Sequence, residues 1–70
     1  MEKVIVINGM HCDHCRASVE KALSAIKGVE ARVDLKRKTA TVKSKTIIDD
    51  QILKDAVTEA GYEVVSISTR

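Results

Sequence analysis

The sequence predicts an α+β fold of the ferredoxin-like kind, a βαββαβ sandwich with two helices on one face of a four-stranded antiparallel sheet. Stretches with strand alternation and stretches with helical spacing follow one another in that order. A chain of 70 residues is expected to form a single domain, 1–70, with a thin core. The chain contains no Phe or Trp and only one Tyr, so this core must be built from aliphatic side chains.

The first half of the chain predicts a strand followed by a helix. Residues 2–8 are β-branched and apolar on both faces, which indicates an interior strand, and Asn8-Gly9 ends it. Residues 14–27 have the apolar spacing of one helical stripe. We expect Asp13 to cap this helix and Gly28 to end it in the left-handed conformation. The stripe consists of Cys15, Val19, Ala22, Leu23 and Ile26.

A β-hairpin is predicted next. Residues 29–35 alternate strictly between apolar and polar side chains, and residues 39–43 alternate again with Ala40 and Val42 facing inward. The Lys-Arg-Lys sequence at 36–38 forms the turn, although it lacks the Gly or Asn of a tight hairpin.

The second helix is predicted to begin after Asp49, which is a suitable N-cap residue. Ile48 before the cap and Leu53 inside the helix have the spacing of a hydrophobic staple. Gly61 is expected to end the helix, and residues 63–68 form the last strand.

This topology brings three loops to one end of the molecule. They are the loop with Cys12 and Cys15, the turn at 36–38, and the Gly61-Tyr62 connection. We therefore expect these segments to form one functional end, with the termini at the other.

Composition excludes several classes of protein. The formal net charge of +2 is too small to indicate a nucleic-acid binder, and no apolar run approaches the roughly 20 residues of a membrane span. The N-terminus does not resemble a secretory signal, so we expect a cytoplasmic protein. In that compartment two close cysteines usually indicate metal or redox chemistry, not a structural disulfide.

The two cysteines, Cys12 and Cys15, bracket the expected helix start. Free N–H groups and the helix dipole stabilise thiolates at such a position, so at least one cysteine should have a lowered pKa. Thiolates select soft ions such as Cu(I) and Zn. Structural Zn requires four ligands, whereas Cu(I) accepts two. The pair is therefore either a soft-metal site or a redox pair.

The segment Gly9-Met10-His11-Cys12-Asp13-His14-Cys15 resembles the GMxCxxC signature of heavy-metal-associated domains. The likeness extends to Ala56-Val57 and Gly61-Tyr62, and within the family it is greatest to bacterial copper chaperones of the CopZ type. The resemblance implies that Cys12 and Cys15 bind Cu(I) and pass it by ligand exchange to a copper-transporting P-type ATPase or a copper regulator. It also implies a carrier and not an enzyme, with a copper-bridged homodimer as a further state.

Three other side chains are expected near the sulfurs. Tyr62 either packs its ring on the second helix or brings its hydroxyl to a cysteine, and the sequence leaves both open. His14 could coordinate the metal or tune the thiolates, but a histidine in an exposed loop is most often solvated. Met10 is expected to fill the core more often than to act as a thioether ligand.

Basic residues gather at the same end. A Cu(I) ion with two thiolates carries a charge of −1, and Arg16, Lys36, Arg37 and Lys38 would place a positive rim around it. A carrier must dock weakly and release its ion, which favours electrostatic steering. We expect the partner to present an acidic face beside its own CxxC pair.

Other functions are less compatible with the sequence. A thioredoxin-like thiol-disulfide oxidoreductase carries a cis-proline, and this chain has no proline. An RNA-binding sheet needs aromatic platforms, and an iron–sulfur cluster normally needs four thiolates. A zinc site made of His11, Cys12, His14 and Cys15 would strain the loop. A carrier of Zn, Cd or Hg on the same scaffold is the nearest alternative.

Overall fold

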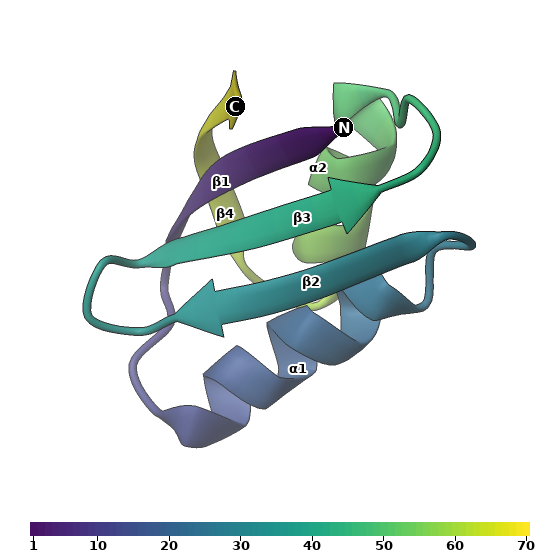
Figure 1. Cartoon of the computed structure of the whole chain (residues 1–70). Helices are drawn as coiled ribbons and strands as arrows, with labels where there is room; N and C mark the ends of the chain where they lie inside the picture. The colour runs from purple at the N-terminus through teal and green to yellow at the C-terminus, as the bar shows by residue number, and fades with distance from the viewer.

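The computed structural model describes residues 1–70 and has the predicted βαββαβ order (Figure 1). Four strands form one antiparallel sheet in the order β2-β3-β1-β4. The elements are β1 (Glu2–Asn8), α1 (Asp13–Ser24), β2 (Val29–Asp34), β3 (Thr39–Ser44), α2 (Asp50–Glu59) and β4 (Glu63–Thr69). The ferredoxin-like fold class is therefore confirmed.

The core lies between the sheet and the two helices and is aliphatic, as predicted. β1 is an interior strand, and its Ile5 and Ile7 are 0% and 1% exposed. Val4 and Val6 are half-buried on the open face of the sheet, which no helix covers. The cluster contains eleven buried residues: Ile5, Ile7, Met10, Val19, Leu23, Ala31, Ala40, Val42, Ile48, Leu53 and Val57.

Helix α1 differs from the prediction at both ends. Cys12, and not Asp13, is the N-cap residue, because its backbone is extended while Asp13 is already helical. The helix ends at Ser24 and not at residue 27, and Ala25 is its C-cap. Gly28 has a positive φ of 79°, but it lies in the turn that enters β2. Ile26 continues to pack against the core beyond the helix end, so the apolar spacing overestimated the helix length.

Helix α2 begins as predicted. The Asp49 carboxylate accepts a hydrogen bond from the backbone N of Gln51 at 2.9 Å, and both staple residues, Ile48 and Leu53, are buried. An additional anchor was not predicted: the side chain of Lys3, which is mostly buried, donates to the Ile48 carbonyl and forms an ion pair with Asp50. This lysine ties β1 to the start of α2.

The three loops meet at one end, as the topology requires. Asn8 at the end of β1 pairs with Glu63 at the start of β4, which places the α2–β4 connection beside the cysteine loop. The backbone N of Ile7 donates to the Lys38 carbonyl at 2.8 Å, which fixes the hairpin turn there. At the opposite end, the Met1 amino group donates to the Ser44 carbonyl at 2.8 Å.

Candidate metal centre

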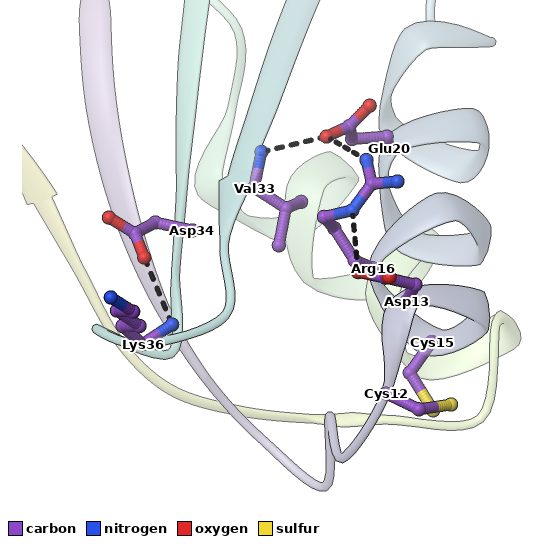
Figure 2. Close-up of polar contacts among 8 residues, drawn as sticks. All are labelled: Cys12, Asp13, Cys15, Arg16, Glu20, Val33, Asp34 and Lys36. Atoms are coloured by element: carbon purple, nitrogen blue, oxygen red, sulfur yellow. Dashed lines mark hydrogen bonds and ion pairs between the residues drawn. The ribbon is translucent and has the colours of Figure 1, made fainter.

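The two cysteines lie together where α1 begins (Figure 2). Gly9, with a φ of 100°, turns the chain out of β1, and Cys12 then caps the helix with an extended backbone. Cys15 lies in the first turn, and that turn is closed by the backbone N of Arg16, which donates to the Cys12 carbonyl at 3.1 Å. Local backbone structure thus positions both thiols.

The sulfurs of Cys12 and Cys15 are 3.5 Å apart, and both cysteines are free. A disulfide would require about 2.05 Å. Cys12 is exposed and Cys15 half-buried, so the pair opens to solvent on one side. No group of three or more His, Cys, Asp or Glu side chains comes together in the chain. Two soft donors on one loop therefore suit an ion that accepts few ligands.

The pKa of the Cys15 thiol is lowered from 9.0 to about 7. The largest cause is the nearby Tyr62 hydroxyl, which favours the thiolate, followed by the backbone of His11 and the thiol of Cys12. Correspondingly, the pKa of Tyr62 is raised, chiefly by its interaction with Cys15. A lowered cysteine pKa was predicted, but a tyrosine hydroxyl is its main cause.

Tyr62 reaches the sulfurs because of how α2 ends. Its backbone N donates to the Val57 carbonyl at 3.2 Å, and Gly61 N donates to Thr58 at 3.0 Å. These two bonds form a Schellman motif, and Gly61 has the positive φ, 97°, that such an end requires. A Cβ atom at Gly9 would lie 3.5 Å from Cδ1 of the Tyr62 ring, so the ring lies against the cysteine loop.

The other expected neighbours lie in different surroundings. Met10 is only 4% exposed and belongs to the hydrophobic core, which agrees with its reading as a core residue. His11 and His14 are both exposed. Neither histidine joins the cysteines in a cluster of three metal-binding side chains.

The basic residues at this end differ in how they are paired. Arg16 donates to Glu20 at 2.9 Å and lies 3.7 Å from Asp13. Arg37 is 3.9 Å from the carboxylate of Asp34. The side chains of the two flanking lysines, at 36 and 38, have no ion-pair partner.

The hairpin turn is held by a residue that sequence reasoning missed. The Asp34 carboxylate accepts from the backbone N of Lys36 at 3.0 Å (Figure 2). It also accepts from the backbone N of Arg37 at 3.2 Å. Lys38 has a φ of 56°, which lies in the left-handed region that a glycine usually occupies. An Asp that accepts from the amides two and three positions later thus stabilises a turn that lacks the Gly or Asn of a tight hairpin.

Two further residues were missed on α1. Ser18 has a lowering effect on the pKa of Tyr62 and so partly offsets its rise. Glu20 accepts from both Arg16 and the backbone N of Val33. Ser18 is three positions after Cys15, a spacing that places it on the same helix face and was the one available signal.

Comparison with known proteins agrees with this arrangement. Residues 4–63 match the sequence profile of the heavy-metal-associated domain, which includes the whole cysteine loop and Tyr62. The chain belongs to the heavy-metal-associated domain family. Membership of this family accounts for the order of helices and strands and for the motif at residues 9–15.

Three relatives show how close the likeness is. "Copper chaperone CopZ" of Staphylococcus haemolyticus is 39% identical over 66 residues, covering 91% of this chain and 97% of that protein. The solved structure of a "CopZ metallochaperone" is 34% identical, with a TM-score of 0.87 over 93% of this chain and all of that one. A copper binding domain from HMA7, a P-type ATPase, is 31% identical, with a TM-score of 0.80 over 99% and 100% of the two chains.

These relatives also bear on the class of activity. The first two are named as a copper chaperone and a metallochaperone, names that describe carriers and not enzymes, which agrees with the prediction for this chain. Neither helix of the chain is long and apolar enough to span a bilayer.

Proposed function

We propose that this chain is a cytoplasmic copper chaperone that binds Cu(I) through Cys12 and Cys15 and delivers it to a P-type ATPase. The observation that carries the proposal is the pair of free sulfurs 3.5 Å apart at the helix start. The names of the relatives support copper as the cargo and an ATPase domain as the acceptor.

Loading begins at Cys15. Its pKa of about 7 means that a large fraction of this thiol is ionised at neutral pH, so Cu(I) competes with fewer protons. Cys12 releases its proton to water as the second copper–sulfur bond forms. Cys12 lies in an extended, exposed segment, so it is the ligand freer to move as the sulfurs separate around the ion.

Transfer proceeds by exchange of thiolate ligands. A thiolate of the acceptor binds the copper while one donor sulfur leaves, so the ion passes through a shared-thiolate intermediate. The second donor sulfur leaves when the second acceptor thiolate binds. Each acceptor thiol loses a proton and each released donor thiol can regain one, and copper remains Cu(I) throughout.

Docking uses the basic end of the molecule. Lys36, Arg37 and Lys38 project from the hairpin turn beside the cysteine loop, and Arg16 follows Cys15 on α1. This rim would steer an acceptor with an acidic face, and weak electrostatic docking would allow the ion to leave. A second copy of this chain presents the same thiols, so a copper-bridged homodimer would form by the same exchange in the absence of an acceptor.

The test is a competition experiment on the purified, reduced protein. Cu(I) and Zn(II) are offered against chelators of known affinity, to the wild type and to Cys12→Ser, Cys15→Ser and His14→Ala. We expect tight binding of Cu(I) alone, lost in both serine variants and retained in the histidine variant. Circular dichroism should show that the serine variants remain folded, because neither cysteine is among the eleven buried residues of the core.

Two results would overturn the proposal. Wild-type Cu(I) affinity in both serine variants would remove the assigned site. Preference for Zn(II) over Cu(I) in this competition would identify a carrier of another soft metal instead.

A further inference from the structure

Glu20 connects α1 to the edge of the sheet (Figure 2). One of its carboxylate oxygens, Oε2, accepts from Nη1 of Arg16 at 2.9 Å and from the backbone N of Val33 at 3.1 Å. Val33 lies on β2, which is an edge strand with one neighbour, β3. The carboxylate thus satisfies an amide that the sheet leaves unpaired, and hydrogen bonds to a charged acceptor are stronger than neutral ones.

Arg16 carries this connection into the turn that holds the thiols. Its backbone N donates to the Cys12 carbonyl at 3.1 Å, and its Nε lies 3.7 Å from the carboxylate of Asp13. Figure 2 shows the resulting series of contacts, from Asp13 through Arg16 and Glu20 to Val33. The series starts between the two cysteines and ends on the sheet.

No side chain caps the helix start itself, because Cys12 makes no capping hydrogen bond. Helix ends without such caps fray readily. The side chains of Arg16 and Glu20 are 36% and 32% exposed, so their contact is better shielded than that of Arg37, which is 83% exposed. The Glu20 contacts therefore restrain the first turn where a cap would otherwise do so.

We propose that Glu20 is a positioning residue of the metal centre. Through its contacts with Arg16 and Val33 it holds the first turn of α1 against β2. This restraint slows the movement of Cys15 that copper release requires. The inference rests on the proposed function and deepens it, since it assigns a determinant of the release rate outside the ligands. It also gives Arg16 an internal role in addition to any contact with an acceptor.

The test compares Glu20→Ala, which removes both contacts, with Glu20→Gln, whose amide oxygen can still accept from Val33 but has no charge for Arg16. Glu59→Gln is the matched control, because Glu59 is exposed and its side chain forms no hydrogen bond or ion pair. The copper-loaded protein is mixed with a small chelator, and the rate of copper loss is measured. Amide hydrogen exchange is followed at Arg16 and Val33 in the same variants.

Changes to groups that support metal ligands cost about 10- to 100-fold in affinity or activity. Because Glu20 acts through the backbone, we expect the lower end, about a tenfold faster copper loss in Glu20→Ala, with Glu20→Gln between it and the wild type. Exchange should rise at Arg16 and Val33 and stay unchanged at the amides of β1, which a general loss of stability would also expose.

A rate of copper loss equal to that of Glu59→Gln would overturn the inference. So would an even rise of exchange across the sheet, since that would show a general structural role. If Glu20→Ala fails to fold, Glu20→Gln decides by the same two measurements. Loss of copper binding in Cys12→Ser and Cys15→Ser beside unaltered Glu20 variants would reject this inference and leave the proposed function standing.

Discussion

At the scale of single residues, the chemistry of the site depends on the contact between Tyr62 and Cys15. The Tyr62 hydroxyl favours the Cys15 thiolate, and the thiolate in turn makes the phenol harder to ionise. The two pKa values therefore shift in opposite directions for one cause. The ring of the same residue lies against Gly9, so Tyr62 both shields the loop and acts on a ligand.

Tyr62→Phe should separate these two roles. It keeps the ring and removes the largest cause of the lowered pKa, so the pKa of Cys15 should rise from about 7 towards 9.0. In the metal-free wild type, the unfolded thiol binds more protons than the folded one between these pH values. Stability should therefore increase with pH across about 7 to 9.0 and decrease as pH falls through that window.

The measurement is ultraviolet titration of the thiolate, with urea unfolding at several pH values. In Tyr62→Phe, stability should depend on pH over a narrower range than in the wild type, because the pKa of Cys15 in the folded protein is closer to its unfolded value. Cys15→Ser serves as the control, since the thiol titration at a pH of about 7 should be absent from this variant. An unchanged Cys15 pKa in Tyr62→Phe would mean that the hydroxyl has no such role.

At the scale of elements, the two ends of α2 have separate tasks. Its start lies away from the cysteines and is held by the Asp49 cap and by Lys3 from β1. Its end is the Schellman motif that places Tyr62 at the metal centre. One helix thus contributes stability at one end and site geometry at the other.

Substitutions at the two ends should show this division. Asp49→Ala removes the cap and should cost about 1 kcal/mol of unfolding free energy without changing Cu(I) affinity. Gly61→Ala forces a side chain into a positive φ and should cost about 1–2 kcal/mol. Because it also displaces Tyr62, it should raise the Cys15 pKa and weaken copper binding. Urea unfolding and chelator competition measure both effects, and equal copper affinity in the two variants would contradict the division.

At the scale of the whole molecule, the segments around the candidate metal centre lie at one end. The cysteine loop, the hairpin turn and the α2–β4 connection meet there, while the termini lie at the other end. The hairpin turn projects Lys36 and Lys38 without ion-pair partners, so these charges remain available to an acceptor.

Reversing these two lysines should therefore affect transfer more than binding. In Lys36→Glu/Lys38→Glu we expect slower copper transfer to the acceptor and nearly unchanged Cu(I) affinity, since rim charges act mainly on association rate. Added salt should slow transfer by the wild type, because charges are screened over about 10 Å at 0.1 M. Stopped-flow transfer across a salt series measures both.

The matched control is Lys27→Glu/Lys45→Glu, which changes the net charge equally at the other end of the molecule. It should transfer copper at close to the wild-type rate. If transfer by the wild type does not depend on salt, or if both double variants behave alike, the hairpin lysines have no docking role.

The amino-acid sequence by itself determined the order of elements, the aliphatic core, the CxxC pair and the end of the molecule at which it lies. These features follow from local spacing and from connectivity, which a single chain displays directly. It overestimated α1 because Ile26 keeps the apolar spacing after the helix has ended. It also misplaced the cap, because Asp13 is already the first helical residue and Cys12, with its extended backbone, is the boundary residue.

Only the tertiary structure decided which side chains support the thiols. Glu20 and Val33 are 13 positions apart, and Lys3 and Asp50 are 47 apart. Tyr62, which lowers the pKa of Cys15, is likewise distant from it in the sequence. No periodicity links such pairs, because their contact depends on how the helices dock on the sheet. The pair of thiols could therefore be read from its spacing, while the groups that surround it required the fold.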